Sequence, residues 1–212
     1  MNNKDKIKAI KFNLFDMAIC DVVRAIRGGS LVGAFILSLC IIDYLAGIYR
    51  KADEGYYKKI VSTYFKKLNP KYDPNYLYAV RCSLVHLYGK SDTLEDANIR
   101  FNLQHKNPEN HLRIAPCSDG KNIYWLNLSN FVFDIIKVAY IFFEKLENKK
   151  EAELAPFIPR AEKIILIRNI LNNKIVSKPN FSSIDPIFAV LDSQNIDWGI
   201  LENDIYKLCL SK

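Results

Sequence analysis

The apolar segment of residues 31–48 constrains the fold of this chain more than any other feature. It is long enough to cross a bilayer as a helix, or to run through the centre of a globular core. Asp43 lies in its second half, and a charge there costs about 2.5–3.5 kcal/mol on membrane-insertion scales. Gly33, Ser38 and Gly47 weaken a membrane span further. We therefore interpret the segment as a buried core helix and expect no membrane association.

Charge and cysteine content indicate the cellular setting. A formal net charge of +7 favours anionic partners, with nucleic acid ahead of a membrane surface. Many mildly basic intracellular proteins that bind no anionic partner have a similar net charge. The sequence contains no dense Lys/Arg block that would decide between this interpretation and nucleic-acid binding. Five cysteines without a CxxC spacing are typical of a reducing compartment. No apolar stretch with a cleavage site follows the polar N-terminus, so we expect a cytoplasmic location.

Apolar residues recur at helical spacing over most of the chain. We expect a helix over residues 5–27, a break at Gly28 and Gly29, and then the core helix, which together would form an antiparallel hairpin. Asp73 and Pro74 suit the start of a later helix, and Gly89 suits its end. The further expected helices cover residues 56–68, 74–88, 130–146, 161–171 and one or two stretches within 184–210.

Three short segments between the helices have a different period. Residues 99–104 alternate apolar and polar side chains as a half-buried strand does, and residues 111–115 and 122–128 are expected to be strands as well. Ser118–Gly120 supplies a turn between the last two strands. We expect these segments to form a small antiparallel β element inserted between helices.

The predicted fold is therefore mainly α. It consists of an antiparallel helical bundle with a small antiparallel β element and a C-terminal helical extension. We expect two parts, a bundle of residues 1–148 and an extension of residues 149–212 whose role no sequence feature indicates.

Arg81 and His86 are the pair of residues best suited to chemistry. An Arg followed after four residues by a His, on a helix within a helical bundle, resembles the HEPN superfamily. The preceding apolar helix, with its segment Ile42–Ala46, adds to the resemblance, which covers roughly residues 10–148. One position departs from the family pattern, because Cys82 follows the Arg where active HEPN ribonucleases commonly have Asn, Asp or His.

The HEPN resemblance implies an endoribonuclease that needs neither metal nor cofactor and leaves a cyclic phosphate. Such a reaction needs a base for the ribose 2′-hydroxyl and a cation for the charge that develops on the phosphate. His86 suits the first role because an imidazole can take up or release a proton near neutral pH. Arg81 suits the second because a guanidinium is always charged and can fork onto a phosphate.

The resemblance also implies a partner. On an ideal α-helix, residues five positions apart point about 140° away from one another, so one copy of Arg81 and His86 should not converge on a small target. Two copies across a twofold axis could, and HEPN domains typically pair in this way. We therefore expect a homodimer with a composite site, RNA as substrate, and a role as a toxin or defence effector with a cognate antitoxin or regulatory protein.

Two other interpretations of the pair stay open. A non-catalytic HEPN module would dimerise and bind a protein or nucleotide partner, and both Cys82 and the C-terminal segment favour it. A purely structural helical adaptor would bury Arg81 and His86 and satisfy their hydrogen bonds within one subunit.

Four residues are expected to support the pair: Asp43, Cys82, Tyr78 and Tyr88. A charge in an otherwise apolar helix is costly unless it is paired, so Asp43 should have a partner, with Arg81 or Arg50 the best placed. Tyr78 and Tyr88, together with Tyr76, could stack on bases, although such rings more often lie in a core.

A metal site is a weaker alternative. Cys82 and His86 are one helical turn apart and could share an ion. No further pair of ligands follows nearby, since His105, His111 and Cys117 belong to the expected β element. We expect no metal site.

Overall fold

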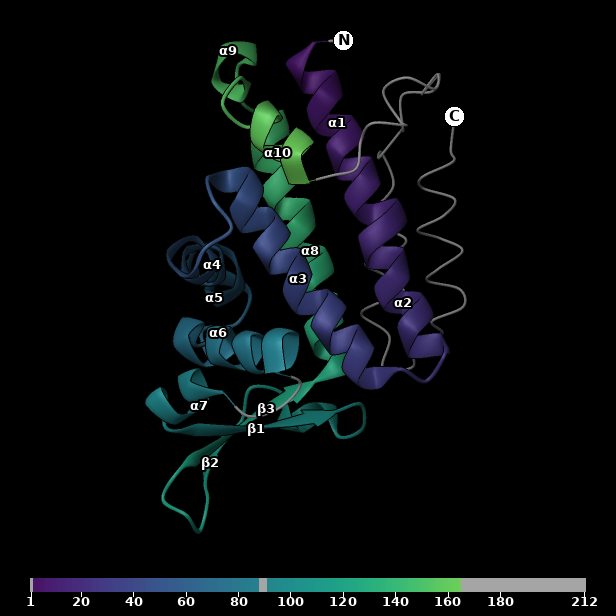
Figure 1. Cartoon of the computed structure of the whole chain (residues 1–212). Coiled ribbons are helices and arrows are strands. Elements are labelled where there is room, and N and C mark those ends of the chain that lie inside the picture. The colour runs from purple at the N-terminus through teal and green to yellow at the C-terminus, as the bar shows by residue number, and fades with distance from the viewer. Residues whose placement is uncertain (1, 88–90, 165–212) are drawn as a thin grey trace. The chain divides into compact units, whose positions relative to one another are not determined.

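A computed structural model of the chain describes residues 2–87 and 91–164 (Figure 1). The described residues are mainly helical and include one small three-stranded sheet, which confirms the predicted mainly α class. The chain divides into two compact units, one of Met1–Ser30 with Phe142–Lys212 and one of Leu31–Ile141. The boundary expected after residue 148 falls inside the first of these units, and a separate C-terminal extension stays a prediction.

The first unit begins with a long continuous helix. Gly28 ends it, and the positive φ of Gly29, 77°, suits a residue without a side chain, so the predicted break is confirmed. Lys11 is buried and its Nζ lies 3.3 Å from the carboxylate of Glu147, which compensates its charge. The helical segments described in this unit are α1 (Asn3–Asn13), a π-helical turn (Leu14–Ile19), α2 (Cys20–Arg27), the end of α8 (Leu128–Glu147), α9 (Glu151–Leu154) and α10 (Ile158–Ile164).

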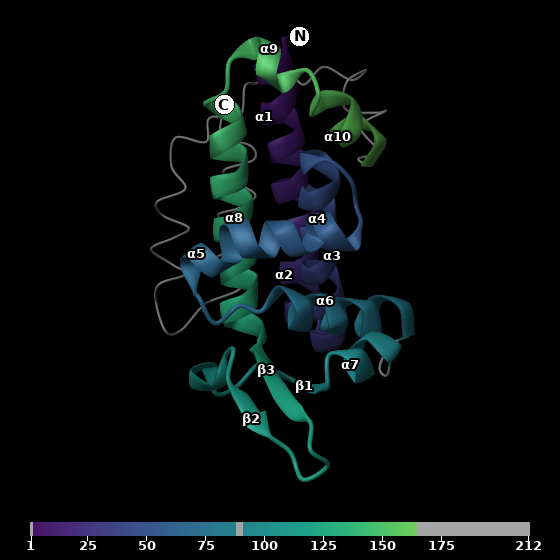
Figure 2. The ribbon, with the colours of Figure 1, turned by 90° about the vertical axis from the view of Figure 1, so that its left-hand side faces the viewer.

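The second unit holds the apolar helix and the residues of the candidate site. Figures 1 and 2 show α4 and α6 running across α3 rather than along it. The two helices of the predicted hairpin belong to different units, and the hairpin stays a prediction. The helical segments of this unit are α3 (Leu31–Tyr49), α4 (Glu54–Ile60), a π-helical turn (Val61–Phe65), α5 (Lys66–Leu68), α6 (Pro74–Cys82), a second π-helical turn (Ser83–Leu87), α7 (Asp92–Asp96) and the start of α8.

Helix α3 forms the core of the second unit. Among the described residues it alone is long and apolar enough to cross a membrane by length and composition, yet 56% of its apolar window is buried inside the fold. Phe35 packs against Phe131 of α8, with ring centroids 6.2 Å apart. This burial supports the predicted core helix. The α3 residues that are at most 1% exposed are Ala34, Phe35, Ser38, Leu39, Ile42, Leu45, Ala46 and Ile48.

The sheet is mixed, so the prediction of a wholly antiparallel element is wrong. Its strands are β1 (Ile99–Gln104), β2 (Ile114–Pro116) and β3 (Asn122–Asn127), in the order β1–β3–β2. β1 pairs parallel with β3, whereas β2 pairs antiparallel with β3. The chain between β1 and β3 exceeds the dozen or so residues that a parallel crossover needs. Side-chain alternation predicts a strand but says nothing about the direction of its neighbour, which is why the pairing was missed.

Backbone turns on either side of β2 account for this topology. Asn107 and Leu112 have positive φ angles of 59° and 62°, and a 3₁₀ turn, Pro108–Asn110, lies between them. After β2, Gly120 has a φ of 79° and donates its N–H to the carbonyl of Cys117, so the predicted turn is confirmed. After the first bend, β2 forms at the far edge of the sheet and not beside β1. The second turn brings the chain back, and β3 then lies between β1 and β2.

A buried hydrogen-bonded cluster fixes the start of α6. The Tyr72 hydroxyl donates to Oδ2 of Asp134 on α8 at 2.8 Å and lies 3.1 Å from Nε2 of His111. Tyr72 is fully buried and immediately precedes Asp73, whose Oδ1 accepts the N–H groups of Asn75 and Tyr76 as the predicted N-cap. Helix α6, and with it Arg81, is therefore held in place from its first turn.

Several predicted features lie outside the described residues. These are the end of the α6 segment at Tyr88 and Gly89, and the helical stretches from residue 165 onward.

The Tyr72 cluster generates a prediction with an internal control. Tyr72→Phe should lower the free energy of unfolding by about 1–3 kcal/mol, because Asp134 and His111 would lose a buried partner. Tyr57 is equally buried, but its hydroxyl has no hydrogen-bond partner among the described residues. Tyr57→Phe should therefore leave stability unchanged or raise it. Urea denaturation of both variants checks this, and equal losses would contradict it.

Candidate functional site

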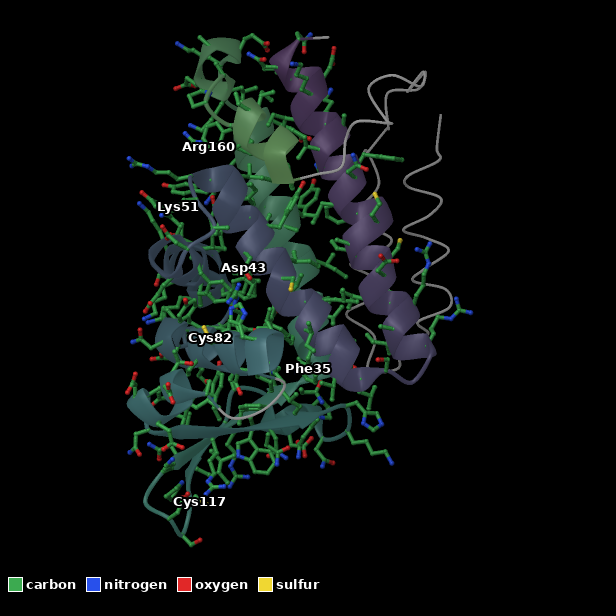
Figure 3. The ribbon with its side chains drawn as sticks, in the orientation of Figure 1. Phe35, Asp43, Lys51, Cys82, Cys117 and Arg160 are labelled. Carbon is green, nitrogen blue, oxygen red and sulfur yellow. The ribbon has the colours of Figure 1, made fainter. Side chains whose placement is uncertain are left out.

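Asp43 and Arg81 form an ion pair between α3 and α6. Nε of Arg81 donates to Oδ2 of Asp43 at 2.8 Å, and the two side chains are 17% and 19% exposed. The prediction that Asp43 is paired, with Arg81 as one of two partners, is confirmed. Figure 3 shows Asp43 on the part of α3 that α6 crosses, near Cys82. Arg50, the other expected partner, instead lies over the ring of Tyr56.

Burial dominates the electrostatics of this ion pair. It raises the pKa of Asp43 above the ordinary carboxyl value, although the hydrogen bond and charge of Arg81 act in the opposite direction. Burial also opposes the charge of Arg81, but the hydrogen bond and charge of Asp43 outweigh it and raise the pKa of the guanidinium. Arg81 is thus a permanent cation whose position depends on one partly buried carboxylate.

Arg81 and His86 lie side by side in a single chain. Nη1 of Arg81 is 2.5 Å from Nε2 of His86. The helix changes to π-helical winding over Ser83–Leu87, where each hydrogen bond spans five residues instead of four. With this winding, two residues five positions apart in the sequence are separated by nearly one full turn, so Arg81 and His86 lie on the same side of the helix. The predicted separation of about 140° is wrong because it assumed ideal α-helical winding.

The hydrogen-bonding capacity of the two side chains defines the state of the imidazole. A guanidinium has only donors, so this contact is a hydrogen bond when Nε2 of His86 accepts, which requires the neutral ring with its proton on Nδ1. His86 is exposed, whereas Arg81 is half-buried beneath it. The three side chains thus form a line. It runs from the partly buried carboxylate of Asp43, through the guanidinium of Arg81, to the exposed imidazole of His86. A purely structural adaptor required His86 to be buried, and this exposure disfavours that interpretation.

Cys82 faces the packed side of the site. The residue is 9% exposed, and its thiol interacts with the hydroxyl of Tyr78 and with Arg81. Burial, followed by this hydrogen bond to Cys82, raises the pKa of Tyr78 to about 12. Tyr78 itself remains half-exposed. Cys82 is therefore a packing neighbour of the site.

The other predicted site residues are not all assembled here. Tyr76 packs edge-on against Tyr124, with ring centroids 5.6 Å apart, and Tyr88 lies outside the described residues. His111 belongs to the Tyr72 cluster described above. Within residues 2–87 and 91–164, no group of three or more His, Cys, Asp and Glu side chains is arranged to hold a metal ion.

Sequence reasoning missed Tyr57 and Lys58 as neighbours of the site. Tyr57 is fully buried beneath it, close enough to Asp43 and Arg81 to feel both charges. Its ring meets that of Tyr78 edge-on at 5.4 Å, and Nζ of Lys58 lies 5.4 Å above the Tyr78 ring. Only the contact between α4 and α6 brings these residues together, and no sequence spacing links them.

Fold and site together define a mainly α protein that carries an Asp–Arg–His line. Comparison of the chain with protein-family models, with curated proteins and with solved structures found no match.

The hydrogen bonds predict opposite tautomers for two histidines. His86 accepts at Nε2 and should carry its proton on Nδ1. His111 accepts the N–H of Asn127 at Nδ1, 3.2 Å away, and should carry its proton on Nε2. Long-range ¹H–¹⁵N correlation spectra above neutral pH distinguish the two forms. The same tautomer at both histidines would contradict the arrangement.

The raised pKa of Asp43 predicts the sign of a pH effect. The folded protein takes up a proton at Asp43 at a higher pH than the unfolded chain does. Stability from this group is therefore present at low pH and is lost as pH rises through the raised pKa. Relative to Asp43→Asn, the wild-type free energy of unfolding should fall over this window, as measured by urea denaturation at a series of pH values.

Asp119 supplies the control for this pH measurement. The hydrogen bond from Arg100 outweighs the opposing effect of desolvation and lowers the pKa of this exposed carboxyl. Relative to Asp119→Asn, wild-type stability should rise with pH through the acid range, and only weakly because solvent screens the pair. Slopes of the same sign for Asp43 and Asp119 would contradict the assignment.

Proposed function

We propose that the chain is a HEPN-like, metal-independent endoribonuclease. The observation that carries the proposal is the line from Asp43 through Arg81 to His86, in which a fixed cation lies 2.5 Å from an exposed neutral base. Cleavage of RNA through its own 2′-hydroxyl needs these two groups and no metal. The site supports that chemistry better than any other arrangement among the described residues.

Each side chain has a defined part in the proposed reaction. A phosphate oxygen of the RNA accepts a hydrogen bond from the outward edge of the Arg81 guanidinium, and Nε2 of His86 becomes free. The imidazole takes the proton of the ribose 2′-hydroxyl, whose oxygen bonds to phosphorus while the bond from phosphorus to the 5′-oxygen breaks. An acid then protonates the leaving oxygen. The products are a 2′,3′-cyclic phosphate and a 5′-hydroxyl.

Asp43 is a positioning residue in this scheme. It accepts from Nε of Arg81, which leaves the Nη edge of the guanidinium for His86 and for a phosphate. The charge that develops on the phosphate then meets a cation that is already oriented.

The proposed assembly is a homodimer in the cytoplasm, acting as a toxin or defence effector with a cognate antitoxin or regulatory protein. The π-helical turn removes the geometric argument for the dimer, because one chain already brings Arg81 and His86 together. The HEPN resemblance still supports it. In a dimer, His86 of the second copy would be available as the acid for the leaving oxygen.

A non-catalytic HEPN module is the second candidate. Cys82 favours it, because this position carries a buried thiol instead of the polar residue common in active HEPN ribonucleases. Arg81 also has hydrogen bonds within its own chain on two sides, to Asp43 and His86, as a structural cation would.

RNA cleavage in the presence of EDTA tests the proposal. Purified full-length protein should cut RNA to products with cyclic phosphate ends, and His86→Ala should lower the rate by about 10²–10⁴-fold, the usual contribution of an acid–base residue. His105→Ala is the matched control, since this exposed histidine lies outside the site and its loss should leave the rate unchanged.

The outcomes separate the two candidates. Cleavage that survives His86→Ala, or that is lost equally in His105→Ala, would contradict the proposed site. Intact RNA after long incubation with wild-type protein, together with a stable dimer in solution, would support the non-catalytic module.

A further inference from the structure

Three half-exposed tyrosines beside the site each have a cation over the ring. The cation lies 5.3–5.7 Å from the ring centroid in all three pairs. We call this group the tyrosine–cation ledge. Its pairs are Arg50 over Tyr56, Lys58 over Tyr78, and Lys59 over Tyr49.

Tyr78 is the member of the ledge that lies next to the Asp–Arg–His line, since its ring meets that of Tyr57 beneath the ion pair. Tyr78 precedes Arg81 by three residues on α6, a rise of about 4.5 Å, and Tyr49 follows Asp43 by six residues on α3, a rise of about 9 Å. Tyr49 and Tyr56 have ring centroids 6.1 Å apart. Figure 3 labels Asp43 on α3 and Lys51 just beyond the end of this helix.

Other tyrosines of the same unit lie in the core instead of at the surface. Tyr57, Tyr72 and Tyr124 are fully buried, and Tyr57 is the direct neighbour of Tyr56 on α4. The fold thus has room for tyrosine in its core. The ledge rings remain half-exposed, and the hold of a cation on such a ring is weak.

The charge of the ledge is suited to an anion. Lys58 is paired with Glu54 at 2.5 Å, and Lys51 with Asp53 at 3.5 Å. Among the described residues, neither Arg50 nor Lys59 forms an ion pair, and both are exposed. Arg50 at the Tyr56 ring and Lys59 at the Tyr49 ring are therefore available to bind a negatively charged group.

We propose that the tyrosine–cation ledge binds single-stranded RNA and leads it to Arg81 and His86. Unpaired bases stack on the tyrosine rings, and the displaced cations, Arg50 and Lys59, move onto the phosphates. Aromatic rings alternating with basic side chains are the common means of holding a single strand, because every base has a π-face. Bases of an RNA duplex are already stacked on one another and cannot use the rings.

This inference rests on the proposed ribonuclease function and narrows its substrate to unpaired RNA. Its test is binding, measured in full-length His86→Ala protein so that the RNA stays intact. The probe is a fluorescein-labelled single-stranded oligouridylate, with an RNA duplex of equal length for comparison, and the readout is fluorescence anisotropy. The single strand should bind more tightly than the duplex.

Ring and charge are tested separately. Tyr56→Leu should weaken binding of the single strand by roughly 5- to 150-fold, the range expected for one lost stacking contact, while Tyr56→Phe should bind as the parent does. Lys59→Gln should lower the slope of log binding constant against log salt by about 0.7. Lys106→Gln, at an exposed loop outside the ledge, is the charge control and should change affinity less. Thermal unfolding verifies that each variant is folded.

The results that overturn the inference are specific. Equal binding by folded Tyr56→Leu and Tyr56→Phe, or equal binding of single strand and duplex, would exclude stacking. Competition by polyglutamate as strong as that by unlabelled oligouridylate would instead make the ledge a surface for an acidic protein. Failure of the proposed function is distinguishable, because wild-type protein would then leave RNA uncut while the ledge variants still lost binding.

Discussion

The negative charge of Asp43 in an otherwise apolar core helix is the constraint on which the rest of the site depends. Helix α3 is largely buried in its unit, and a carboxylate within it must be paired. Arg81 is the partner, so the ion pair joins α6 to α3 at this point. The Tyr72 cluster and the Asp73 cap hold the first turn of α6 to the sheet side and to α8, which delivers Arg81 to Asp43.

The π-helical turn Ser83–Leu87 brings His86 against this ion pair. With α-helical winding, His86 would point away from Arg81, and the ion pair would be structural only. The wider turn places the imidazole against the guanidinium, so that the charge fixed by Asp43 acts on an exposed base. Such turns occur frequently at functional sites. Here the turn also changes the expected role of a second subunit, from completing the Arg–His pair to supplying a further proton donor.

Tyrosine is used in two distinct ways around the site. Tyr57 is fully buried, close enough to Asp43 and Arg81 to feel both charges. Tyr78, whose ring meets that of Tyr57, faces outward under Lys58 and begins the ledge. The contact between α4 and α6 therefore has a buried ring, that of Tyr57, on one side and a half-exposed ring beneath a cation, that of Tyr78, on the other.

The sequence by itself determined the features that follow from local pattern. The core helix, the mainly α class, β1, the Asp73 cap and the glycine turns were predictable because periodicity and turn chemistry act over a few residues. It also determined that Asp43 needed a partner. Only the tertiary structure decided which partner, how the strands pair, and that Arg81 meets His86. Those outcomes depend on how α6 crosses α3 and on where the helix widens, and no spacing along a single chain encodes either of them.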